Sequence, residues 1–157
     1  MRKRSEKWAW NRRRVVRPRD GARRLKKTIV AVLLAIYLGF ILDITLLHFQ
    51  GKPGVNLVPF QAIIRDVREG GRNFVVNVLG NLGVFVPLGL AIPILQERPT
   101  RAWQVALIGF DLSLGIELAQ YALGRRVADI DDILMNTTGA VLGHAVSTSG
   151  RWRNHPR

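Results

Sequence analysis

The chain has 157 residues, with 24 Lys and Arg against 11 Asp and Glu, a formal net charge of +13, and no cysteine. The absence of cysteine excludes disulfides, Cys-ligated metals and Cys nucleophiles. Thirteen of the 24 basic residues lie in residues 1–27, and no aromatic-interleaved basic repeat follows, so the charge does not indicate a nucleic-acid partner. A basic block before an apolar run instead predicts a disordered cytoplasmic tail that contacts anionic lipid headgroups.

The first apolar run covers residues 28–47. Its 20 residues, at about 1.5 Å per residue in a helix, match the roughly 30 Å hydrocarbon core of a bilayer. In the following connection, residues 56–60 (NLVPF) predict a turn. Residues 62–72 then mix apolar and charged side chains, and this pattern predicts a short amphipathic helix along the membrane surface.

Two further apolar runs carry polar residues that need partners. In residues 75–95, Asn77 and Asn81 are four apart and share one helix face, which should point into a bundle. Helix packing and ligand binding both account for this pair. Residues 102–123 contain Asp111 and Glu117, each costing about 2.5–3.5 kcal/mol to insert. Ser113, Glu117, Gln120 and Tyr121 form one polar stripe, and Asp111 lies off it, in another contact.

The fourth run, residues 133–149, is the shortest, and Gly139 and Gly143 give it a small-xxx-small spacing. Asp129 or Asp131 is expected to cap its N-terminus, where backbone N–H groups attract anions. The predicted fold is all-α: a four-transmembrane-helix bundle with a short interfacial helix after the first span. It forms one domain over residues 28–149, between basic cytoplasmic tails at 1–27 and 150–157.

The distribution of basic residues predicts the topology. With four spans, residues 1–27, 96–101 and the C-terminal tail share one side and carry thirteen, two and three Lys or Arg. The connections at 48–74 and 124–132 share the other side and carry four and two. The positive-inside rule therefore places both termini in the cytoplasm of a multi-pass cell-membrane protein, with both polar connections outside.

Three motifs carry a resemblance to a known family. They are NLVPF at 56–60, NVLGNLGVFVPLGL at 77–90 and IELAQYALGRRVADIDDILMNTTGAVLG at 116–143. In this order they resemble the VanZ-like family of small bacterial membrane proteins, over residues from about 30 to 147. Two features depart from the family pattern: Ala128 stands where an aromatic residue is common, and the N-terminal tail is longer and more basic than usual.

The resemblance implies a role at the cell envelope, since the founding member is similar to an accessory factor that raises tolerance to teicoplanin. The family residues fall on these positions: Asn56, Pro59, Phe60, Asn77, Asn81, Phe85, Pro87, Gly89, Glu117, Gln120, Arg126, Asp129, Asp132, Asn136 and Gly139. No cofactor is implied, and the sequence does not indicate a homo-oligomer.

The first functional hypothesis is a non-enzymatic protein that binds a lipid-linked molecule or the acyl chain of a lipoglycopeptide. Its ligand-binding residues are expected to face outward: Asn56, Asn77, Asn81, Glu117, Gln120, Arg126, Asp129, Asp132 and Asn136. Arg126 is suited to a carboxylate or phosphate, which its planar fork binds bidentately. A structural alternative is that these side chains bind one another and only lock the helices together.

The second hypothesis is a metal-assisted membrane enzyme acting on a phosphorylated lipid or lipid-linked cell-wall precursor. Glu117, Asp129 and Asp132 would hold a divalent cation, with Glu117 and Asp132 as candidate catalytic residues. No glycine-rich phosphate loop, nucleophile–base pair or His-rich metal site accompanies them, and no resident metal is expected.

Overall fold

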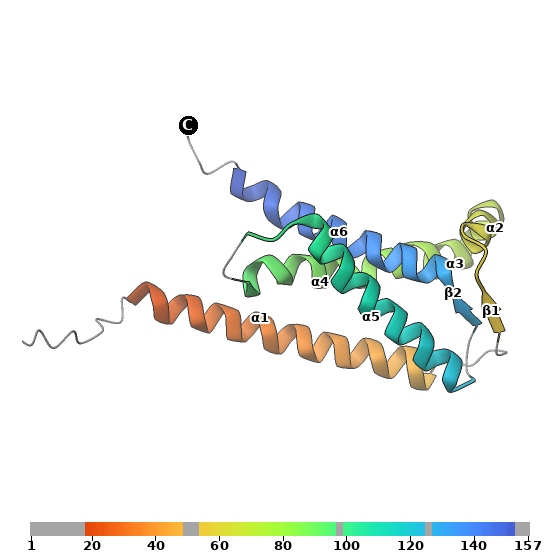
Figure 1. Ribbon diagram of the computed structural model, residues 1–157, viewed down its shortest axis with the longest axis horizontal. Coiled ribbons are helices and arrows are strands. Elements are labelled where there is room, and N and C mark those ends of the chain that lie inside the picture. Colours follow the sequence, from red (N-terminus) through yellow and green to blue (C-terminus); the bar gives the residue numbers. More distant parts are fainter. Residues whose placement is uncertain (1–17, 49–53, 97–98, 125–126, 153–157) are drawn as a thin grey trace, which may run out of the picture.

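The computed structural model describes residues 18–48, 54–96, 99–124 and 127–152. Most of the described residues are helical (Figure 1). The elements in order are α1 (Pro18–Asp43), a π-helical turn η1 (Ile44–His48), β1 (Gly54–Asn56), α2 (Gln61–Glu69), α3 (Gly71–Asn73), a π-helical segment η2 (Phe74–Gly80), α4 (Asn81–Leu95), α5 (Ala102–Ala122), β2 (Val127–Asp129) and α6 (Ile130–Trp152).

Three helical stretches are long and apolar enough to cross a membrane: Asp20–Leu47, Gly71–Leu95 and Ala102–Ala122. They correspond to the first three predicted spans. The predicted fourth span lies in α6, which has 23 residues but is not one of these three. Asn136, His144 and several hydroxyl residues interrupt its apolar run. The described residues therefore supply three helices of this kind, and the four-span bundle is not established by them.

The first helix begins earlier than the sequence predicts. It starts at Pro18, whereas the predicted span starts at Thr28, so residues 18–27 belong to a helix rather than to the tail. Proline suits the first helical position because its fixed φ is already helical. The negative charge of Asp20 in the first turn interacts favourably with the positive end of the helix dipole. The predicted tail residues 1–17 and 153–157 lie outside the described residues.

Helices α4, α5 and α6 share one core, built from Phe85, Leu88 and Ile92 of α4, Val105 and Ile116 of α5, and Ala140 of α6. Glycines bring α4 and α6 into backbone contact. A Cβ on Gly139 would lie closer to the carbonyl oxygen of Leu82 than the 3.0 Å that real Cβ contacts respect, and Gly89 and Gly143 are equally crowded. The small-xxx-small spacing therefore packs α6 against α4.

Helix α1 keeps its apolar surface largely uncovered in the described structure. Its apolar residues Leu33, Ile36 and Phe40 are 61%, 64% and 59% exposed, as expected for a helix surrounded by lipid. The hydroxyl of Tyr37 donates a hydrogen bond of 3.0 Å to the carbonyl oxygen of Val84 in α4. This contact joins α1 to the three-helix core.

The all-α prediction missed one feature, a two-stranded parallel sheet. Strand β1 pairs with β2 in the register Gly54–Val127, Val55–Ala128 and Asn56–Asp129. The two strands and α2 lie at one end of the molecule, and the start of α1 and the end of α6 lie at the opposite end (Figure 1). Each strand is only three residues long, too short to show a pattern in the sequence.

Candidate functional site

The strand pair brings together two segments that are about 70 residues apart in the chain. Because Asn56 and Asp129 are paired in register, their side chains can meet, and Asn56 Nδ2 donates to Asp129 Oδ2 at 3.1 Å. The backbone N–H of Asp129 donates to Glu117 Oε2 of α5 at 2.9 Å. The sheet thus joins both connecting segments to the end of α5.

Asp129 also caps α6, as predicted. Helix α6 begins at Ile130, so Asp129 occupies the N-cap position, and its Oδ1 accepts the backbone N–H of Asp131 at 2.9 Å. A side-chain oxygen at the N-cap thereby accepts a backbone N–H of the first turn that has no partner within the helix. Asp131, the other candidate for that role, has a different function in the fold.

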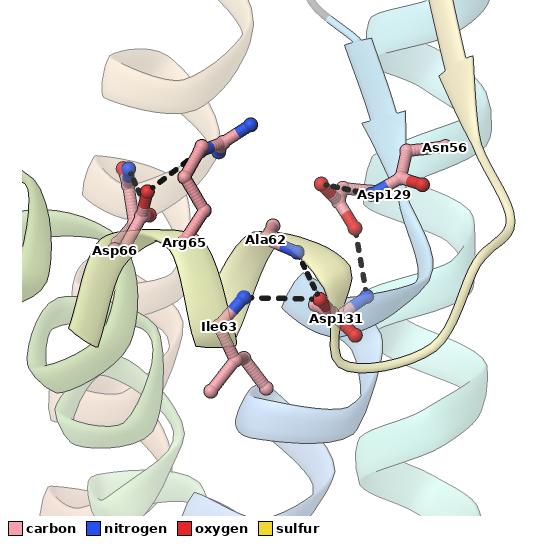
Figure 2. A network of polar contacts seen from close by, with 8 residues as sticks. Asn56, Ala62, Ile63, Arg65, Asp66, Asp129 and Asp131 are labelled. Carbon is pink, nitrogen blue, oxygen red and sulfur yellow. Dashed lines mark hydrogen bonds and ion pairs between the residues drawn. The ribbon is translucent and has the colours of Figure 1, made fainter. Parts of the chain in front are cut away.

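Asp131 caps α2, a helix about 70 residues earlier in the chain. Its Oδ1 accepts the backbone N–H of Phe60 at 2.5 Å. Its Oδ2 accepts the backbone N–H groups of Ala62 at 2.8 Å and Ile63 at 3.1 Å (Figure 2). Asp131 is 2% exposed, so its carboxylate depends on these three donors and on the helix dipole of α2. The cap fixes α2 against the start of α6.

Two buried carboxylates bind the amides of the second span. Asn77 Nδ2 donates to Asp66 Oδ2 at 2.8 Å, and Asn81 Nδ2 donates to Asp132 Oδ1. Asp66 also forms an ion pair with Arg65, whose Nε lies 3.0 Å from Asp66 Oδ1. This hydrogen bond raises the pKa of the Arg65 guanidinium. The prediction that Asn77 and Asn81 find partners within the protein is confirmed.

We call this set of bonded side chains the carboxylate–amide network. Its members are Asn56, Asp66, Asn77, Asn81, Glu117, Asp129, Asp131 and Asp132. Six of the nine predicted ligand-binding residues belong to it, and each of the six makes hydrogen bonds inside the protein. The structural alternative therefore accounts for much of the cluster, since buried carboxylates need such partners.

The other two described candidates, Gln120 and Asn136, are only partly satisfied. Gln120 Nε2 donates to the carbonyl oxygen of Thr45 at 3.1 Å, and Asn136 Nδ2 donates to Ser113 Oγ at 2.9 Å. Their exposed fractions are 1% and 7%. In the described part of the chain, Gln120 Oε1 and Asn136 Oδ1 have no hydrogen-bond partner. A buried acceptor left unpaired costs about 1–3 kcal/mol, so both oxygens call for an explanation.

The remaining predicted residues lie elsewhere. Arg126 is outside the described residues. Tyr121 does not share the polar stripe, because it is 52% exposed while Ser113, Glu117 and Gln120 are buried. Asp111 is exposed on α5, off the buried stripe, as its angular offset predicted, and the other contact expected for it stays a prediction.

Sequence reasoning missed Asp66 and Asp131 as members of the network. The pattern of residues 62–72 places Asp66 among the charges of a surface helix, and the position of Asp131 predicts a cap for its own helix. The run of Asp129, Asp131 and Asp132 was a usable signal, since one helix N-terminus rarely needs three carboxylates. Within the described ranges, no group of three or more His, Cys, Asp or Glu side chains is placed to hold a metal ion.

The structure has three helices long and apolar enough to cross a membrane, and a parallel strand pair and a buried carboxylate–amide network lie at one end of them. These features are consistent with a helical membrane protein. The family model for VanZ/LLP1 matches residues 27–150. The chain therefore belongs to the VanZ-like family. No curated protein and no solved structure matches it.

Proposed function

We propose that the protein binds a lipid-linked or amphiphilic ligand at its strand-bearing end, on the outer side of the cell membrane. The observation that carries the proposal is that two buried oxygens, Gln120 Oε1 and Asn136 Oδ1, have no hydrogen-bond partner among the described residues, and that each residue follows a network member, Glu117 or Asp132, by about one helical turn. A ligand that donates hydrogen bonds to them would offset the cost of their burial. The proposed site comprises Asn56, Asn77, Asn81, Glu117, Gln120, Arg126, Asp129, Asp132 and Asn136.

The proposed topology has four crossings, with α6 as the fourth, and both termini in the cytoplasm. Its 23 residues, at about 1.5 Å each, are long enough for the hydrocarbon core, and its polar side chains Asn136 and His144 are both 7% exposed. A span whose polar residues face other helices tolerates a lower average hydrophobicity. In this orientation the network faces the compartment where cell-wall antibiotics act.

The protein is proposed to contribute to teicoplanin tolerance, the phenotype associated with the founding member of the family. Teicoplanin carries an acyl chain, and the exposed apolar residues around α2 offer a surface for such a chain beside a polar cluster. The metal-assisted enzyme is the less favoured candidate, because Glu117, Asp131 and Asp132 accept hydrogen bonds from amide or backbone N–H groups.

A matched pair of variants tests the proposal. Asn136→Leu removes the unpaired oxygen together with the amide that binds Ser113, whereas Ser113→Ala removes only the partner of the amide. The full-length protein in nanodiscs is titrated with teicoplanin and with a glycopeptide that lacks an acyl chain. We expect about a tenfold loss of teicoplanin affinity in Asn136→Leu, and a smaller loss in Ser113→Ala.

The same variants, with Glu117→Gln and Asp132→Asn, are then expressed in cells and their abundance is measured. Loss of teicoplanin tolerance at normal abundance supports a binding site. Loss of abundance in parallel with tolerance supports the structural alternative instead. Equal affinity in Asn136→Leu and the unmodified chain would contradict the proposal.

A further inference from the structure

A shallow hollow lies along the exposed side of α2. Its volume is about 570 Å³. Val58, Pro59 and Ile64 form its apolar part, and Arg65, Arg68 and Glu69 form its charged part. The hollow therefore combines an apolar wall with two guanidinium groups and one carboxylate.

The residues next to the hollow form an apolar surface that the protein leaves uncovered. Leu57, Val58 and Phe60 are 71%, 57% and 57% exposed, and Ile64 and Val67 of α2 are 47% and 54% exposed. These side chains project from a single turn and the helix that follows it. Large exposed apolar residues in one place mark a surface that contacts lipid or another apolar group.

Hydrogen bonds at the start and on the inner face of α2 hold this surface in place. Asp131 holds the backbone of Phe60, Ala62 and Ile63, and Asn77 holds Asp66 on the inner face of α2. Phe60 itself has the left-handed backbone conformation, with φ of 67°, which turns the chain into α2. The hollow thus rests on a helix that is anchored at its start and on its inner face.

The guanidinium groups are oriented toward the surface. Asp66 bonds the Nε of Arg65 (Figure 2). The side chain of Asp66 is 2% exposed, whereas that of Arg65 is 57% exposed. Arg68, three residues later on the same helix, is also exposed. Two Arg side chains beside one another suit a phosphate, because each planar fork donates hydrogen bonds in the geometry that phosphate oxygens accept.

We propose that this hollow binds the phosphate group of a membrane lipid, with Arg65 and Arg68 on the phosphate and the apolar part of the lipid along Val58, Pro59 and Ile64. A soluble phosphate would leave the apolar wall unused, and a neutral lipid would bring no negative charge to the exposed guanidinium groups. The chemistry of the hollow therefore fits a lipid that has both parts. This site shares its apolar side chains with the surface offered above to an acyl chain, but its phosphate contact uses Arg65 and Arg68 and neither Gln120 nor Asn136, so it goes beyond the function proposed above.

The test is native mass spectrometry of the full-length protein, purified in detergent. It is titrated with phosphatidylglycerol and with a neutral glycosyl diacylglycerol that has the same acyl chains. The variants are Arg68→Gln alone and Arg65→Gln with Arg68→Gln. Arg72→Gln is the matched control, because Arg72 is exposed on the adjacent α3 but does not line the hollow.

The double variant is expected to lose at least about tenfold in affinity for phosphatidylglycerol while its affinity for the glycolipid is unchanged. Arg68→Gln, which leaves the Arg65–Asp66 ion pair intact, should lose severalfold. Glu69→Gln should bind phosphatidylglycerol more tightly, since it removes the one acid in the hollow. Arg72→Gln should differ by no more than about twofold.

Three results would overturn the proposal. One is an equal loss in Arg72→Gln, which would indicate general attraction of anionic lipid. Another is an equal loss for the glycolipid, which would indicate misfolding or purely apolar contact. The third is complete competition by inorganic phosphate or by an acidic peptide, which would assign the hollow to a soluble anion. Because Asn136→Leu should leave phosphatidylglycerol binding intact, the two proposals can fail separately.

Discussion

At the scale of single residues, burial forces the carboxylates of this protein to find partners, and Asp131 is the clearest case. Its two oxygens take three backbone N–H donors from the start of α2. Asp131 therefore caps the N-terminus of α2, although it belongs to α6. Its charge also complements the positive end of the helix dipole, so the contact is stronger than a neutral hydrogen bond.

Asp131→Asn is therefore expected to loosen α2. The amide group of Asn has the same shape but only one accepting oxygen, so at least one buried N–H loses its partner. The expected loss in the free energy of unfolding is about 1–3 kcal/mol. Trypsin cleavage after Arg65 and Arg68 in the folded protein measures the local effect, and it should become faster.

Glu69→Gln is the control for this change, since it removes a carboxylate from the exposed end of the same helix. Its unfolding free energy should stay within about 0.5 kcal/mol of the unmodified protein. If α2 remained as resistant to trypsin in Asp131→Asn as in Glu69→Gln, the trans cap would not be what holds it.

At the scale of elements, the contact between α4 and α6 depends on glycine. The carbonyl oxygen of Leu82 occupies the place where a side chain on Gly139 would begin. Gly139→Ala must therefore push the helices apart, at a cost of about 1–3 kcal/mol or more. Gly83→Ala on α4 is the matched control, because nothing lies within 4 Å of its Cβ position.

Gly83→Ala should be neutral or slightly stabilising, since Ala is favoured over Gly in a helix interior by about 0.8–1 kcal/mol. Chemical unfolding of the two variants in detergent micelles measures the difference. Equal stability of Gly139→Ala and Gly83→Ala would mean that the two helices do not approach as closely as described.

Elements were predictable from the sequence where their signal is local. The apolar runs located α1, the Gly71–Leu95 stretch and α5, and the mixed pattern at 62–72 located α2. The shared face of Asn77 and Asn81 follows from helix geometry. Their partners could not be predicted, because Asp66 and Asp132 reach them only after the chain has folded. The strand pair and the Asp131 cap join segments about 70 residues apart and have no local signature for the same reason.

At the scale of the whole molecule, the carboxylate–amide network lies at the strand-bearing end. The number of membrane crossings decides on which side of the membrane that end lies. β1, β2 and α2 share that end, opposite the start of α1 and the end of α6 (Figure 1). With four crossings, the strand-bearing end is outside and both termini are inside, which agrees with the excess of Lys and Arg near the termini. With three crossings, α6 would leave the membrane and expose its apolar residues to water.

The natural absence of cysteine allows this topology to be tested without background labelling. Single cysteines are introduced at Glu69 on α2, at Lys26 on α1 and at Ser149 on α6, and intact cells are treated with a membrane-impermeant maleimide. Glu69→Cys should be labelled in intact cells, whereas Lys26→Cys and Ser149→Cys should be labelled only after the cells are permeabilised. Labelling of Ser149→Cys in intact cells would place the end of α6 outside. In that case α6 does not complete a fourth crossing, and the proposed outward site would lose the membrane-embedded helix that supplies Asp132 and Asn136.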